Sequence, residues 1–99
     1  MRVLMRVSIP VAQGNEAIKN GSLPQIIGKF MEAHKPEAAF FVSDRGLRTA
    51  YFGVDLPSTI DLPSFAEPFF MGLGATVEIM PAMNPADMQA GVKKAMDAQ

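Results

Sequence analysis

The first nine residues of the chain, Met1–Ile9, read MRVLMRVSI, and this stretch decides how the rest of the chain folds. Its odd positions are all apolar, whereas its even positions include Arg2 and Arg6, which is the period-two pattern of a β-strand. One face of this strand is therefore purely apolar, and the other face carries two arginines. We expect the strand to lie in the middle of a sheet, with its second face against something other than bulk water.

Alternation, capping signals and proline or glycine breaks divide the remaining chain into further elements. Ser22, Ser58 and Asn84 each precede a pattern typical of a helix start. Pro68 is expected to kink the second helix or to end it early, because proline has no backbone N–H to donate. In chain order, the expected elements are a strand over 1–9, a helix over 23–35, strands over 38–43 and 47–56, a helix over 59–71, a strand over 75–80 and a final helix to about residue 97.

The order strand, helix, strand, strand, helix, strand is that of the α+β ferredoxin-like fold, here with an extra C-terminal helix. This βαββαβ plan predicts a single domain over residues 1–99, with a four-stranded antiparallel sheet in the order 4-1-3-2 and both crossover helices on one face. The turn Asp44-Arg45-Gly46 is expected to join the second and third strands as a hairpin. The residues expected to face the helices are Val3, Met5, Val7, Phe40, Val42, Ala50, Phe52, Val54, Ala75, Val77 and Ile79.

The opposite face of the sheet is expected to bring Arg6, Tyr51 and Glu78 together, with Phe41 further out. The first interpretation is structural: a second copy of the chain covers this open face, and two sheets pack as a twofold homodimer. The second interpretation is a catalytic pocket. In it the guanidinium holds a carboxylate or enolate oxygen, the phenol donates a proton or hydrogen bond, and the carboxylate acts as a base.

The segment Val11–Pro24 is polar and interrupted by glycine, and we expect it to be the least regular part of the chain. Asn15 is expected to cap a short helical turn and Ser22 to cap the next helix, so that two helix starts present backbone N–H groups near Lys19. These three residues form a candidate anion-binding site. The alternative is a loop with a purely structural role.

Composition excludes several functional classes. Nine basic and ten acidic residues give a net charge of -1, so we expect no nucleic-acid partner. The chain has no cysteine and one histidine, His34, so we expect no metal centre and no cofactor. His34 ends the first predicted helix, where it is favourable with the helix dipole; a catalytic role would need a carboxylate neighbour.

Hydropathy bears on location and assembly. No apolar run is long enough to span a membrane, and no cationic-then-hydrophobic leader precedes the first strand, so we expect a cytoplasmic protein without membrane contacts. The hydrophobic fraction of 48% and the mean hydropathy of +0.14 are high for so small a domain. Part of the apolar surface is therefore expected to lie in a subunit interface.

The segments GNEAIKNGSLP, KPEAAFF, AEPFF and MNPADM, together with the order of elements, give the chain a family resemblance. It resembles small uncharacterised bacterial proteins of the dimeric α/β-barrel, ferredoxin-like superfamily. That superfamily includes cofactor-independent monooxygenases, muconolactone isomerase-like enzymes and haem-degrading enzymes, but no haem-ligand motif surrounds His34. The resemblance implies a homodimer with a cavity in each subunit, often between sheet and helices, and it favours His34 and the loop residues over the open face.

These patterns predict a homodimer, formed through the open sheet face, that binds a small organic ligand. One alternative is a cofactor-independent enzyme, monooxygenase-like or isomerase-like, acting on a small carbonyl or aromatic substrate. The other is a structural or interaction module without a ligand. The sequence leaves all three open.

Overall fold

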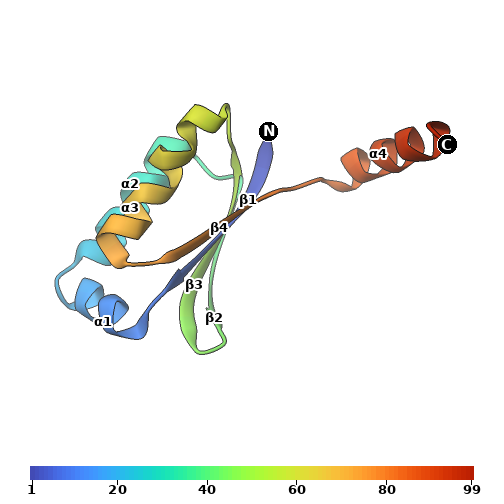
Figure 1. Cartoon of the computed structure of the whole chain (residues 1–99). Helices are drawn as coiled ribbons and strands as arrows, with labels where there is room; N and C mark the ends of the chain where they lie inside the picture. Colours follow the sequence, from blue (N-terminus) through green and yellow to red (C-terminus); the bar gives the residue numbers. More distant parts are fainter.

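The computed structural model describes residues 1–99 as one α+β body from which the C-terminal helix projects (Figure 1). The predicted elements are present, with shifts of at most three residues at their ends. In chain order the elements are β1 (Arg2–Ile9), α1 (Val11–Lys19), α2 (Ser22–His34), β2 (Ala38–Asp44), β3 (Leu47–Asp55), the 3-10 helix η1 (Thr59–Asp61), α3 (Leu62–Leu73), β4 (Thr76–Pro81) and α4 (Pro85–Asp97). None of these helices combines the length and the apolar character needed to cross a membrane.

The four strands form one antiparallel sheet in the order β2-β3-β1-β4, which confirms the predicted order. The first strand, β1, lies between β3 and β4, and its register sets Arg6 opposite Tyr51 on one side and opposite Glu78 on the other. This arrangement is compatible with a ferredoxin-like plait. The open face therefore carries the cross-strand neighbours that the alternation of β1 predicts.

The hydrophobic core lies between the sheet and the layer formed by α2 and α3, which cover the same face of the sheet (Figure 1). Met5 and Phe52 are neighbours across β1 and β3, and both are fully buried. Phe30 of α2 and Phe69 of α3 pack on Phe52, with ring centroids 4.7 Å and 6.0 Å away. The apolar face of β1 is thus covered as its pattern predicts.

The prediction of which β2 side chains face the helices is wrong. Phe41 pairs with Ala50 and lies on the helix side of the sheet, whereas Phe40 pairs with Tyr51 and lies on the open side with Val42. The cause is the hairpin turn, in which Arg45 and Gly46 both have positive φ and Asp44 pairs with Leu47. The apolar run AAFFV has no alternation of its own, so the turn alone fixes its register.

The expected irregular segment 11–24 contains an additional helix. Strand β1 ends at Ile9, and α1 follows directly with Pro10 as its N-cap, so Asn15 lies inside the helix and caps nothing. Gly21 has the left-handed conformation that its position predicts, but it is itself the N-cap of α2. The Ser22 side chain therefore does not cap this helix; its backbone N–H donates to Asn20 Oδ1 at 2.9 Å.

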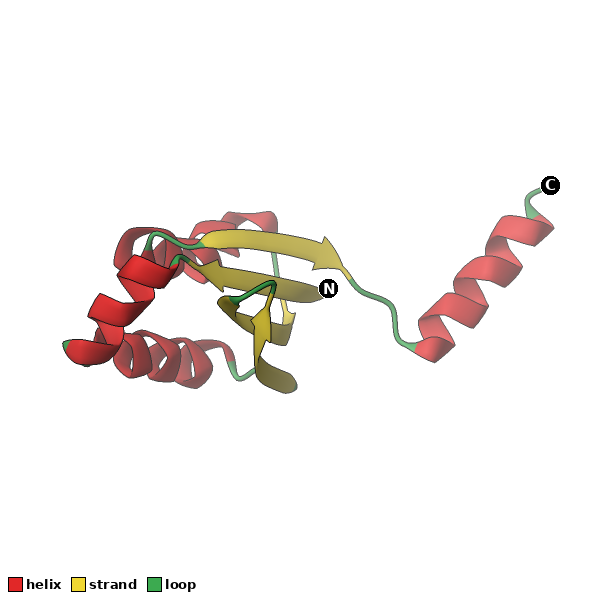
Figure 2. Ribbon diagram, turned by 90° about the horizontal axis from the view of Figure 1, so that it is seen from below, coloured by secondary structure: helices red, strands yellow, loops and turns green.

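The last two predicted helices also exist, and the first of them begins three residues later than expected. Ser58 caps η1 by accepting from the N–H of Ile60, and α3 follows and continues past Pro68 to Leu73, so the early end expected at this proline is wrong. Asn84 forms the predicted capping box at the start of α4. Figures 1 and 2 show α4 projecting beyond the end of β4, away from α2 and α3.

Candidate ligand-binding site

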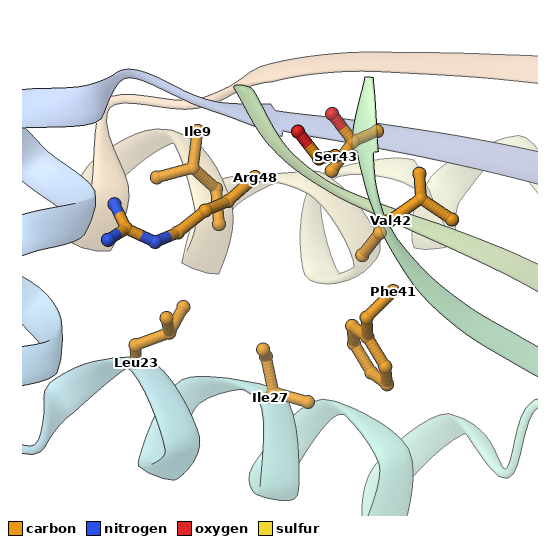
Figure 3. Close-up of a pocket in the computed structure, with 9 residues that line it drawn as sticks. Ile9, Leu23, Ile27, Phe41, Val42, Ser43 and Arg48 are labelled. Carbon is orange, nitrogen blue, oxygen red and sulfur yellow. The ribbon is translucent and has the colours of Figure 1, made fainter. Parts of the chain in front are cut away.

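A pocket of about 290 Å³ opens between α2 and the outer half of the sheet (Figure 3). Leu23 and Ile27 of α2 form one wall, and Phe41 of β2 closes one end. Ile9 and the small side chain of Ala50 lie on the sheet side of the pocket. The complete lining is Ile9, Leu23, Ile27, Phe41, Val42, Ser43, Arg48, Thr49 and Ala50.

The pocket exists because the helix layer does not fully cover the outer strand β2. Ile27 is half-buried, and Phe41 keeps 56% of its surface exposed although it lies on the helix side. Ala50 is the smallest side chain of its face on β3 and leaves space between its neighbours Arg48 and Phe52. An apolar depression with few polar groups is typical of small-molecule sites.

Arg48 is the charged residue of this pocket. Its position on β3 belongs to the same face as Ala50 and Phe52, so its side chain lies on the helix side and extends over Ile9 toward α1 (Figure 3). Its Nη2 donates to Asn15 Oδ1 at 3.0 Å. None of the six ion pairs of the chain includes Arg48, so no carboxylate neutralises its charge.

Gly14 and Ser43 shape the surroundings of Arg48. A Cβ at Gly14 would lie 2.7 Å from Arg48 Nη1, so glycine at this point of α1 lets the guanidinium approach the helix backbone. Ser43 pairs with Arg48 across β2 and β3 and also lines the pocket. Both residues therefore line the same apolar site, but the Arg48 guanidinium extends away from Ser43 toward α1 (Figure 3).

Of the three candidates for anion binding, Asn15 and Lys19 lie one turn apart on α1, whereas Ser22 begins the next helix. Asn15 lies next to the pocket through its bond to Arg48, but Lys19 and Ser22 line none of the pockets of the chain. The two helix starts are separated by the whole of α1, which is nine residues long and therefore about 13 Å in length. The proposed convergence of their N–H groups is wrong.

On the open face, Arg6, Tyr51 and Glu78 do meet, and Asp44 joins them. Arg6 Nη1 donates to Glu78 Oε1 at 2.8 Å, and Arg6 Nη2 donates to Asp44 Oδ2 at 2.9 Å. The Tyr51 hydroxyl donates to the same Asp44 oxygen at 2.9 Å. The predicted Glu78–arginine pair is therefore confirmed, and all three polar partners of Arg6 are hydrogen-bonded within the cluster.

This cluster shifts the ionisation of its members. Hydrogen bonds from Arg6 and Tyr51 lower the pKa of the Asp44 carboxyl, because they stabilise its charged form. The bonds to Asp44 and Tyr51 raise the pKa of Arg6 above its usual value. Arg2, the other arginine of β1, is not part of this cluster: it donates to Glu37 at 2.7 Å and to Asp87 at 3.0 Å. The lowered pKa of Asp44 and the raised pKa of Arg6 keep this one pair charged at neutral pH.

His34 lies on the other side of the sheet from this cluster. Its ring stacks on Phe65 with a centroid distance of 3.8 Å and lies 4.9 Å from the ring of Phe30. It borders a depression shared with Asp61 and Ser64, but no hydrogen bond joins its ring to either residue. His34 is therefore separate from both the pocket and the open-face cluster.

Comparisons with protein-family models, with curated proteins and with solved structures found no match. The family resemblance of the sequence stays a prediction.

Sequence reasoning missed two residues of these sites, Arg48 and Asp44. The signal for Arg48 was available, because the alternation that buries Ala50 and Phe52 also turns position 48 toward the helices. The signal for Asp44 depended on the face of β2, which the apolar run does not reveal.

Acid should weaken the fold partly through Asp44. Because its pKa is lower in the folded chain than its ordinary value of 3.8, the carboxylate stabilises the fold above that value, and the contribution is lost as pH falls through the lowered pKa. We expect Asp44→Asn to be less stable than the wild type at neutral pH and the difference to shrink in acid. Urea unfolding at several pH values measures this, with exposed Glu67→Gln as the matched control; a difference that does not change with pH would contradict it.

Proposed function

We propose that this protein is a homodimer that binds a small organic carboxylate in the pocket between α2 and the sheet. One observation carries the proposal: Arg48, which has no acidic partner, lines a pocket whose other residues are mostly apolar. The apolar part of the ligand lies against Leu23, Ile27 and Phe41. Its carboxylate lies at Arg48.

The chemistry of the pocket supports this class of ligand. A guanidinium presents N–H donors in a planar fork that matches the two oxygens of a carboxylate, and charged hydrogen bonds of this type are stronger than neutral ones. An amine would be repelled by the same charge. The volume of about 290 Å³ is at the lower end of the range for small-molecule sites, which favours a small ligand.

The open sheet face supports the homodimer. Phe40, Val42 and Met80 are exposed on this face, and Phe40 keeps 66% of its surface in solvent. In a dimeric α/β barrel, two such faces pack against each other around a twofold axis, and their apolar side chains leave water. Arg6 and its partners would then be enclosed with their hydrogen bonds already made, which removes much of the cost of burying them.

A ligand series tests the proposal. Octanoate and 3-phenylpropionate are expected to bind, octanol and 3-phenylpropanol to bind more weakly, and octylamine to give no measurable heat in titration calorimetry. Ile27→Asp should abolish carboxylate binding, because it places a negative charge on the wall of the pocket. Ile18→Asp is the matched control on the exposed part of α1 and should bind as the wild type does. Equal binding of acids, alcohols and amine would contradict the proposal.

The enzyme alternative has weaker support. Tyr51, Asp44 and Glu78 are each occupied by hydrogen bonds to one another or to Arg6, which suits a structural network better than a set of groups free to receive a proton. Its test is turnover of a carbonyl and aromatic substrate panel. Full activity in Tyr51→Phe, His34→Ala and Arg6→Ala would remove these residues from any mechanism.

A further inference from the structure

Helix α4 has no cover within its own chain. Every residue from Pro85 to Asp97 is exposed, and apart from the capping box with Asn84, the ion pair between Asp87 and Arg2 is its one side-chain bond to the rest of the molecule. The projecting helix gives the chain a radius of gyration of 15.8 Å, whereas a compact domain of this length has about 13 Å. The chain is therefore not compact as a single copy.

The sequence of α4 is that of a helix with one buried face. Met88, Val92 and Met96 recur at four-residue intervals on one side, and Val92 keeps 55% of its surface exposed. Lys93 and Asp97 form an ion pair outside this stripe. An isolated helix of 13 residues is marginal in water, and Gly91 in its interior costs about 1 kcal/mol more than alanine would. A stable α4 thus needs a partner for its apolar stripe.

The start of α4 directs it away from its own sheet. The N–H of Ala82 donates to the carbonyl of Arg2 at 3.1 Å, so the backbone continues the ladder beyond β4. Asp87 in the first turn is then held by the Arg2 guanidinium at the end of β1. With these contacts in place, the helix lies beyond the end of the sheet rather than over it (Figures 1 and 2).

We propose that α4 of each copy packs on the outer half of the partner's open sheet face, along β2 over Phe40 and Val42. This inference rests on the proposed homodimer and specifies which element completes it. The two surfaces match in chemistry, because each is an uncharged apolar row that its own chain leaves exposed. They also match in length, since Met88 to Met96 extend for about 12 Å along α4 and Ala38 to Val42 for about 13 Å along β2.

The contact area supports the exchange. Two sheets of this size, packed face to face, cover a projected area of about 950 Å² in total. If each α4 covers the outer part of the partner's sheet, and the inner parts of the two sheets still meet, the total rises to about 1,300 Å². The exchange of α4 therefore enlarges the contact between the two copies by about a third.

Cysteine cross-linking tests the proposal. The chain has no cysteine of its own, so every disulfide must come from the introduced residues. The tagged Phe40→Cys variant is mixed with the untagged Val92→Cys variant. After the two variants have exchanged subunits, the thiols are oxidised under mild conditions. We expect a disulfide-linked mixed dimer, several-fold more abundant than with Ala90→Cys, which lies on the opposite side of α4. Val42→Cys replaces Phe40→Cys if circular dichroism shows that the latter does not fold.

Three other outcomes would contradict the inference, and they distinguish failure of the α4 exchange from failure of the homodimer. A disulfide within one chain of the Phe40→Cys/Val92→Cys double variant would mean that α4 folds back on its own sheet. A dimer in sedimentation that gives no mixed cross-link would leave the proposed homodimer standing and remove the exchange of α4. A species of 10.7 kDa alone at micromolar concentration would overturn the homodimer and the exchange together.

Discussion

Replacing Phe52 with alanine is expected to lower the free energy of unfolding by about 3–5 kcal/mol. Its side chain is fully buried at the centre of the core, and its ring packs against the rings of Phe30 and Phe69. The substitution removes the ring and leaves a cavity that the rigid sheet cannot close. Because a domain of this size has a total stability of about 5–15 kcal/mol, this one change removes a large share of it.

Urea unfolding followed by far-ultraviolet circular dichroism measures this effect. Phe70→Ala is the matched control, because Phe70 lies next to Phe69 on α3 but keeps 43% of its surface exposed. The control should cost clearly less than Phe52→Ala. A loss below about 1 kcal/mol for Phe52→Ala would mean that this ring is not at the centre of the core.

Arg48→Met is expected to weaken the binding of octanoate by about 10- to 150-fold, which corresponds to the loss of one charge-assisted hydrogen-bonded contact of about 1.5–3 kcal/mol. Methionine keeps much of the apolar stem of Arg48 over Ile9, so the walls of the pocket remain. The binding of octanol should change little. This selective loss separates recognition of the carboxylate from general damage to the pocket.

Arg45→Met is the matched control for this variant. Arg45 lies in the hairpin turn three residues before Arg48, is exposed and does not line the pocket. The control removes the same formal charge and should bind octanoate as the wild type does. Arg48→Met with unchanged octanoate affinity would exclude the guanidinium as the carboxylate partner.

The sheet was predictable from the sequence because alternation in β1 and β3 is strict. Met5 and Phe52 are placed in the core by this alternation, and Arg6 and Tyr51 are placed on the open face. Strands with one buried face have a strongly specified register, since a slip of one residue would expose the whole apolar set. The strand order follows from the rules for connecting such elements.

Two parts of the fold were not predictable in this way. The run AAFFV of β2 is apolar at every position, so the hairpin turn at Arg45 and Gly46 decides which of its phenylalanines faces the helices. Helix α1 has Pro10 at its N-cap and Gly14 in its interior, and both residues suggested a break. Packing of Ala17 against the core outweighs the low helix propensity of that glycine.

The candidate site was predictable only in part, because it depends on helix α1 and on the register of β2. Asn15 was expected to bind an anion through a helix start, but it lies inside α1 and holds Arg48 in place instead. The pocket depends on Phe41 facing α2, and therefore on the register that the turn imposes. The open-face cluster followed from cross-strand pairing, except for Asp44, which comes from the strand with the wrong predicted face.

The central claim is that a small carboxylate lies between α2 and the sheet, and methyl NMR tests it most directly. The chain has six isoleucines, of which Ile9 and Ile27 line the pocket, while Ile60 and Ile79 do not. On titration with octanoate, we expect the methyl resonances of Ile9 and Ile27 to shift in a saturable way and those of Ile60 and Ile79 to stay in place. Saturation without a shift at Ile9 and Ile27, or no binding at all, would contradict the account.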